Sequence, residues 1–331
     1  MVKPVPVPQE LLDFIRTGTK FLLAGHKEPD GDCIGSSLAL ASALRRLGKE
    51  AILCSAGPFK RTEIKSYEPL FTSSPGEAER RNAQVIIIDC SSQERTGDLE
   101  AHIKDLPLAL IDHHCTGVCP GEGTVVYLDP EAPSATSMIL ALIEALGLSP
   151  TVEEAEYLLF GFCTDTGFFR HIDAGNMEAF ACAGRMVGAG ASPKNTFNAI
   201  NGGKSFNSRI LLGIQLSRVE EYFGGRLIYT CEEYEETRRF GLEGRDSDSL
   251  YQLLLSVVHV EAIVVIRQET PERCTVGLRS RDWVDVAAVA ADFGGGGHKN
   301  AAGFARTAII ADLKPTILSR FERIFTPAAG C

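Results

Sequence analysis

The stretch KFLLAGHKEPDGDCIGS, residues 20–36, decides the fold that we expect for this chain of 331 residues. An apolar run ends at a histidine, an acidic turn follows, and a helical pattern then runs from about Ser36 to Leu47. Further apolar runs of this kind are EAILC (50–54), QVIIIDC (84–90), LPLALIDHH (106–114) and TVVYLDP (124–130). Short β-rich runs that alternate with helical segments are typical of an α/β fold with a parallel sheet.

Acids and histidines stand directly after three of the predicted strands. They are His26, Asp30, Asp32, Asp89, Asp112, His113 and His114. A further acid, Asp165 in FCTDTGFF, follows a helical segment and has neighbours that suit an exposed turn. Because the carboxyl ends of parallel strands open onto one crevice, we expect these side chains to meet there.

Each of these residues alone also has an ordinary structural interpretation. An aspartate after a strand is often a helix N-cap, and the dipeptide Asp-Gly is common in turns. Caps do not explain histidines beside several of the acids, and uncompensated carboxylates gathered in one crevice would repel one another. Carboxylate ligands with a minority of imidazoles suit Mn²⁺, with Mg²⁺ or another divalent ion as the alternative. Five or six ligands are enough for two ions.

The composition places the chain among globular proteins. Hydrophobic residues make up 44% and charged residues 23% of the sequence, close to globular averages. The first residues lack the apolar stretch of a secretion signal, and no run approaches about 18 apolar residues. We therefore expect a cytoplasmic protein without membrane association.

The formal net charge of −10 argues against a protein that coats long duplex nucleic acid, because such binding depends on many Lys and Arg contacts. It does not argue against a small anionic substrate, since clustered cations can reverse the local field.

The length predicts two domains. Residues 1–187 form the expected catalytic metal-binding domain, and the glycine- and proline-rich segment 188–217 is the expected linker with a short helix. Residues 218–331 alternate strand-like and helical segments and contain four consecutive glycines (294–297) followed by His298, so we expect a smaller mixed α/β domain there.

The motifs HKEPDGDCIGS, IIIDC, IDHH and CTDTGFF, in this order, resemble the four motifs of the DHH phosphoesterase superfamily. The second half adds GLRSRD around Arg279 and FGGGGHKNAAG (293–303), which resemble the accessory substrate-binding domain of many members. The two-domain layout most resembles the NrnA-like enzymes, described as bifunctional oligoribonucleases and 3'-phosphoadenosine 5'-phosphate (pAp) phosphatases. An active site in the cleft between the two domains is part of this resemblance.

The resemblance also implies roles for single residues. One metal would be held by His26 and Asp30, the other by Asp32, His113 and Asp165, with Asp89 between them. His114 would face the phosphate, and Asp112 would support the neighbouring histidines. The residues implied in substrate binding are Arg279, Gly296, Gly297 and His298, which could hold a terminal phosphate. For His171 and His259 we expect no functional role.

The implied activity is the hydrolysis of short oligoribonucleotides, of dinucleotides or of pAp to mononucleotides. The alternatives are an inorganic pyrophosphatase, a cyclic or linear dinucleotide phosphodiesterase, and a metal-dependent nucleotide-binding protein without catalysis. The sequence leaves a homodimer open.

Overall fold

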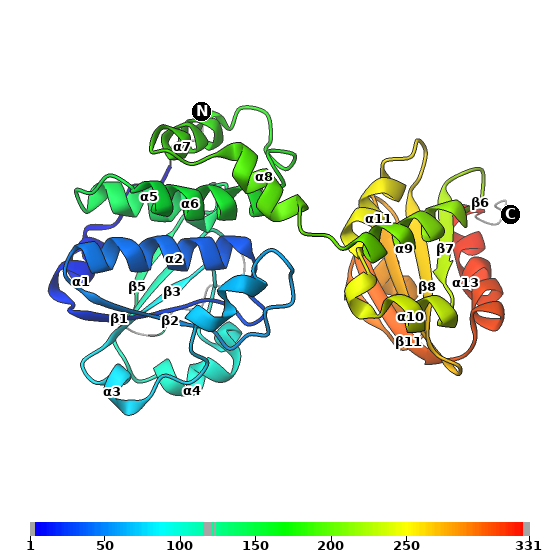
Figure 1. Ribbon diagram of the computed structural model, residues 1–331, viewed down its shortest axis with the longest axis horizontal. Helices are drawn as coiled ribbons and strands as arrows, with labels where there is room; N and C mark the ends of the chain where they lie inside the picture. Colours follow the sequence, from blue (N-terminus) through cyan, green and yellow to red (C-terminus); the bar gives the residue numbers. More distant parts are fainter. Residues whose placement is uncertain (1–3, 115–120, 122, 327–331) are drawn as a thin grey trace, which may run out of the picture. The chain divides into compact units, whose positions relative to one another are not determined.

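The computed structural model describes residues 4–114, 121 and 123–326. The chain divides into two compact units, Met1–Gly203 and Lys204–Cys331 (Figure 1). The division falls inside segment 188–217, which contains two helices, α8 (Pro193–Asn201) and α9 (Phe206–Ser217), where the sequence suggested one. Ser192 and Ser205 accept hydrogen bonds from backbone amides of these helices, and such caps explain how helices begin within a polar, glycine-containing segment.

The first unit contains a five-stranded sheet in which every pair of neighbouring strands is parallel. The strand order is β2-β1-β3-β4-β5. The strands are β1 (Lys20–Ala24), β2 (Glu50–Cys54), β3 (Gln84–Ile88), β4 (Leu108–Asp112) and β5 (Val125–Leu128). The predicted parallel α/β sheet is confirmed. Its central strands β1, β3 and β4 are apolar except for Lys20, Gln84 and Asp112 at their ends, because helices cover both faces of these strands.

Two helical layers enclose this sheet (Figure 1). The helices of the first unit are α1 (Gln9–Thr17), α2 (Gly31–Arg46), α3 (Glu77–Arg80), α4 (Glu100–Ile103), α5 (Ala135–Ala145), α6 (Val152–Asp165), α7 (Met177–Gly188) and α8. Helices α2, α5 and α6 lie on one face, and α3 and α4 lie on the other. Alternate residues of β1 serve the two faces, since Phe21 and Leu23 belong to the core under α2 whereas Leu22 belongs to the opposite core.

Glycines let α2 and α6 approach each other closely. A Cβ atom on Gly161 would lie 2.9 Å from the carbonyl oxygen of Gly31, and one on Gly35 would collide with the carbonyl oxygen of Tyr157. This close packing brings the first turn of α2, with Asp32, beside the last turn of α6, with Asp165.

The second unit contains a six-stranded mixed sheet in the order β10-β11-β9-β8-β7-β6. The strands are β6 (Glu220–Tyr222), β7 (Leu227–Glu232), β8 (Ala262–Thr270), β9 (Arg273–Ser280), β10 (Gly296–His298) and β11 (Ala301–Thr307). The helices are α9, α10 (Tyr234–Phe240), α11 (Ser247–Leu255), α12 (Val286–Ala291) and α13 (Ile310–Phe325). Only the β7–β8 pair is parallel, so the expected smaller mixed α/β unit is confirmed.

None of the helices in the described part of the chain combines the length and apolar composition needed to span a bilayer.

Candidate metal centre

The acids and histidines of the first unit come together where the sequence placed them, after β1, β3 and β4. Three groups of side chains offer ligand atoms within 4.8 Å of one another. The groups are His26, Asp30 and Asp89; Asp32, His113 and Asp165; and Asp89, His113 and His114. The six predicted ligands therefore lie in two groups that Asp89 connects.

Asp30 both caps a helix and faces the centre. Its Oδ1 accepts hydrogen bonds from the backbone amides of Asp32 and Cys33, each 3.1 Å long, and so begins α2 at Gly31. The sequence predicted this helix from about Ser36, because the Asp-Gly pair looked like a turn. The same Oδ1 lies 3.8 Å from Nε2 of His26, so the capping role and a place in the cluster are compatible.

Asp89 lies between the two groups of candidate metal ligands. Its Oδ2 is 3.7 Å from Nε2 of His26, and its Oδ1 is 3.5 Å from Nε2 of His113. The side chain is almost fully buried, and Oδ1 has no hydrogen-bond partner among the described residues. Burying an unpaired carboxylate oxygen is costly, and a cation between Asp89 and the imidazoles would remove that cost.

Backbone carbonyls orient both imidazoles of the two groups. Nδ1 of His26 lies 2.9 Å from the carbonyl oxygen of Lys27, and Nδ1 of His113 lies 3.3 Å from that of Ala132. A hydrogen bond from Nδ1 fixes the tautomer that leaves Nε2 free to bind a metal. Both Nε2 atoms face the carboxylates of the centre.

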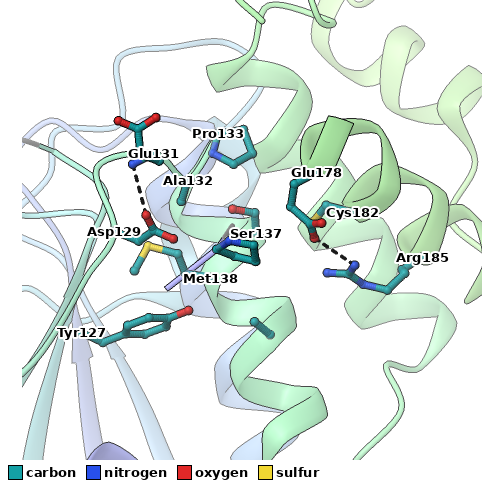
Figure 2. A pocket seen from close by; sticks show the side chains of 12 residues that line it. Tyr127, Asp129, Glu131, Ala132, Pro133, Ser137, Met138, Glu178, Cys182 and Arg185 are labelled. Atoms are coloured by element: carbon teal, nitrogen blue, oxygen red, sulfur yellow. Dashed lines mark hydrogen bonds and ion pairs between the residues drawn. The ribbon is translucent and has the colours of Figure 1, made fainter. Parts of the chain in front are cut away.

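The loop that contains Ala132, whose carbonyl oxygen contacts His113, is fixed by hydrogen bonds of its own (Figure 2). Asp129 accepts hydrogen bonds from the amides of Val5 and Glu131, and so ties the N-terminal segment to the loop that contains Ala132.

Figure 2 shows a small cavity beside this loop, with a volume of about 50 Å³. This volume suits a few water molecules and is too small for a nucleotide.

The carboxylates and imidazoles shift one another's pKa values. Burial, strengthened by neighbouring carboxylates, raises the pKa of Asp32 well above its usual range. Burial opposes the charged form of His113, but the nearby carboxylates of Asp89 and Asp32 outweigh it and raise the His113 pKa to about 10. His26 follows the same pattern beside Asp30, with a pKa raised to about 9. The excess of negative charge thus favours the cationic, doubly protonated form of both imidazoles. Divalent cations would compensate the same negative charge.

His114 lies beside the cluster and is partly open to solvent, with 42% of its side chain exposed. Its Nδ1 lies 2.7 Å from Oδ1 of the fully buried Asp112, which also accepts the His114 backbone amide. This hydrogen bond is the largest cause of the raised pKa of His114. Asp112 therefore contacts His114, whereas His113 is held by a carbonyl group.

Two of the expected substrate-binding residues of the second unit, Arg279 and His298, lie in one row across its sheet. Arg279 on β9 pairs with Ala301 on β11, which in turn pairs with His298 on β10. The Arg279 guanidinium carbon lies 4.5 Å from the centroid of the Tyr251 ring, a contact that the sequence did not reveal. A phosphate that approached this row would meet the cationic side chain and the exposed strand β10 together.

The four consecutive glycines have different structural roles. Gly294 has a φ of 79° in the turn that follows α12, as in a left-handed helix end. A Cβ atom on Gly295 would collide with the carbonyl oxygen of Gly303, and one on Gly297 would lie 2.5 Å from that of Ala301. Gly296 is exposed, has open space beside an added Cβ atom and, unlike Gly294, does not lie in the left-handed region. Backbone conformation therefore explains Gly294, and chain packing explains Gly295 and Gly297, whereas Gly296 needs another reason.

Two features of the first unit escaped the sequence interpretation. The first is that backbone amides and a hydroxyl at the start of α5 bind the carboxylate of Asp32. The sequence signal for these donors was weak, since it consists only of the short segment APSAT (132–136) after β5. In addition, a hollow of about 520 Å³ adjoins Asp165 and is lined in part by His171, Asp173 and Asn176. A hollow of this size can hold a nucleoside.

Acids and imidazoles gathered at the carboxyl ends of parallel strands, with one carboxylate facing two imidazoles, suit the active site of a metal-dependent phosphoesterase. The chain belongs to the DHH family, since residues 20–162 match the DHH family, N-terminal domain, and residues 224–326 match the DHHA1 domain.

A curated relative and two solved structures resemble the chain. The bifunctional oligoribonuclease and PAP phosphatase NrnA of Thermus thermophilus is 33% identical over 282 residues, which cover 85% of this chain and 82% of the relative. An exopolyphosphatase-related protein from Bacteroides fragilis has a TM-score of 0.77 at 22% identity, covering 96% of this chain and 98% of that chain. The exonuclease RecJ bound to manganese has a TM-score of 0.52 at 16% identity, covering 98% and 96%. The two structures share the fold.

Proposed function

We propose that this phosphoesterase hydrolyses short oligoribonucleotides and pAp to mononucleotides with two divalent metal ions. The observation that carries the proposal is the position of Asp89, whose two oxygens face the imidazoles of two separate ligand groups. The name of the Thermus relative, an oligoribonuclease and PAP phosphatase, supports this choice of substrates.

The chain offers a complete ligand set for two ions. His26 and Asp30 would hold one, Asp32, His113 and Asp165 the other, and Asp89 would be shared. When bound, the two ions would supply an activated water and neutralise charge on the phosphoryl oxygens. Four carboxylates with two imidazoles favour Mn²⁺ or Mg²⁺, and we propose Mn²⁺.

His114 would contact the phosphoryl group in this proposal. Asp112 accepts the hydrogen bond from Nδ1, so Nε2 remains available to donate to a phosphoryl oxygen. The raised pKa of His114 favours the protonated ring, whose positive charge suits an anionic substrate. Asp112 thus keeps the ring in one orientation while substrate binds and products leave.

The second unit would provide a phosphate contact. We propose that Arg279, Gly296, Gly297 and His298 bind a substrate phosphate away from the reacting one. A fixed phosphate contact favours short substrates, because a longer chain extends beyond it.

Arg279→Ala is expected to raise KM about 10-fold or more while kcat changes little. The substitution removes charge-assisted hydrogen bonds to a substrate phosphate that is not the reacting one, so it should affect binding more than the chemical step. Steady-state kinetics with pAp measure both constants. Arg281→Ala is the matched control, since Arg281 is two residues away and its guanidinium contacts the carbonyl oxygen of Leu255. An equal rise of KM in both variants would count against a specific role of Arg279.

The proposed function is tested by a Mn²⁺-supplemented panel of pAp, RNA dinucleotides and pentanucleotides, linear and cyclic dinucleotides, and pyrophosphate. We expect mononucleotide products from pAp and from the short RNAs. Rapid cleavage of pyrophosphate with no turnover of dinucleotides would overturn the proposal. Binding without any hydrolysis would instead indicate a nucleotide-binding protein.

A further inference from the structure

The first turn of α5 donates three hydrogen bonds to the carboxylate of Asp32. Oδ2 accepts the amide of Ala135 at 2.6 Å, and Oδ1 accepts the amide of Thr136 at 2.9 Å and its hydroxyl at 2.7 Å. Asp32 is 1% exposed and Thr136 is fully buried, so water does not compete for these bonds. Asp32 is therefore fixed by a segment that lies 104 positions later in the sequence.

The Thr136 hydroxyl is itself fixed. The Ser134 and Thr136 hydroxyl oxygens lie 2.8 Å apart, and Ser134 Oγ accepts the amide of Ser137. Ser134 can therefore donate its own proton to Thr136, which donates to Asp32. The Thr136 methyl group lies against Gly161, where an added Cβ atom would be only 2.5 Å away. Hydrogen bonds and packing thus hold Thr136 in one rotamer.

This arrangement leaves one oxygen of Asp32 with bonding capacity. A carboxylate oxygen has two lone pairs, and both of those on Oδ1 are used by Thr136. Oδ2 accepts only one bond, and it is the oxygen that faces Nε2 of His113, at 3.9 Å. A metal next to His113 would therefore meet a single ligand atom of Asp32.

We propose that Thr136 is a positioning residue that restricts Asp32 to single-oxygen coordination and thereby favours small six-coordinate ions over Ca²⁺. Mg²⁺ demands near-ideal octahedral geometry with short bonds, whereas Ca²⁺ takes six to eight oxygens and often binds both oxygens of a carboxylate. Releasing Oδ1 would relax this restriction. The inference rests on the proposed metal centre.

The test compares Thr136→Val, Thr136→Ser and wild type by titration calorimetry with Mn²⁺ and with Ca²⁺, in the absence of substrate. Thr136→Val keeps the shape of the side chain but removes the hydroxyl that donates to Asp32. It should weaken Mn²⁺ binding at one site by about 10- to 100-fold, which is typical when a hydrogen-bond partner of a metal ligand is removed. Ca²⁺ binding should change much less, so the preference for Mn²⁺ should shrink. Thr136→Ser restores the hydroxyl and should restore the preference.

Ser137→Ala is the matched control, because Ser137 is the next residue and its hydroxyl bonds to the Ser134 carbonyl and not to Asp32. Thermal unfolding of the metal-free proteins checks the fold, and Thr136→Ala replaces the valine variant if that variant does not fold. Two results would overturn the inference: unchanged Mn²⁺ affinity in the variant without the hydroxyl, or an equal loss of affinity for Mn²⁺ and for Ca²⁺. A wild-type protein that binds no Mn²⁺ would instead refute the proposed centre.

Discussion

Asp89→Ala is expected to abolish turnover of both pAp and RNA dinucleotides. Asp89 faces His26 with one oxygen and His113 with the other, so its loss removes a ligand from each proposed metal site. Losing a residue that only supports a ligand typically costs 10- to 100-fold, so losing the shared ligand should lower kcat/KM by more than about 100-fold. Initial rates with saturating Mn²⁺ measure the effect.

Asp105→Ala provides the control for the loss of a carboxylate, because Asp105 is exposed and precedes the neighbouring strand. Asp89→Asn adds a second comparison, since it keeps the size of the side chain without its charge, and we expect it to be nearly as inactive as the alanine variant. Activity retained in Asp89→Ala would refute the shared-ligand arrangement.

Gly161→Ala should damage the centre without changing any ligand. The added methyl group would lie 2.5 Å from the Thr136 methyl, 2.9 Å from the Gly31 carbonyl oxygen and 3.0 Å from the Asp32 Cα. Overpacking of this kind costs about 1–3 kcal/mol of unfolding free energy. Because Asp32 and Thr136 would have to move, Mn²⁺ binding should weaken as well.

Gly184→Ala is the matched control for this variant, since Gly184 also lies within a helix but has no neighbour within 4 Å of an added Cβ atom. It should raise the unfolding free energy by about 0.5–1 kcal/mol, because alanine is the better helix former. Urea unfolding of the metal-free proteins measures both changes. The same effect of both substitutions would show that the contact between α2 and α6 is not tight.

The sheet of the first unit could be predicted because its strands are buried on both faces and appear as apolar runs. Helix starts were less predictable. The helix that begins at Gly31 depends on the Asp30 cap, and Asp165 lies in the last turn of α6 where its neighbours suggested a turn. Local residue preferences did not decide these places, because side-chain hydrogen bonds and packing outweighed them.

The clustered acids and histidines could be found in the sequence because they lie at the ends of recognisable strands and of one helix. The groups that orient them could not. The Ala132 carbonyl and the Thr136 hydroxyl reach His113 and Asp32 through tertiary contacts, and no periodic pattern connects such distant positions. The glycine motif shows the same limit, since only the strand contacts reveal that Gly295 and Gly297 serve packing.

The number of Mn²⁺ ions bound per chain at saturation, measured by equilibrium dialysis, tests the central claim most directly. Two ligand groups that share Asp89 predict two ions for the wild-type protein and fewer for Asp89→Ala. One ion or none bound to the wild-type protein would contradict the two-metal centre.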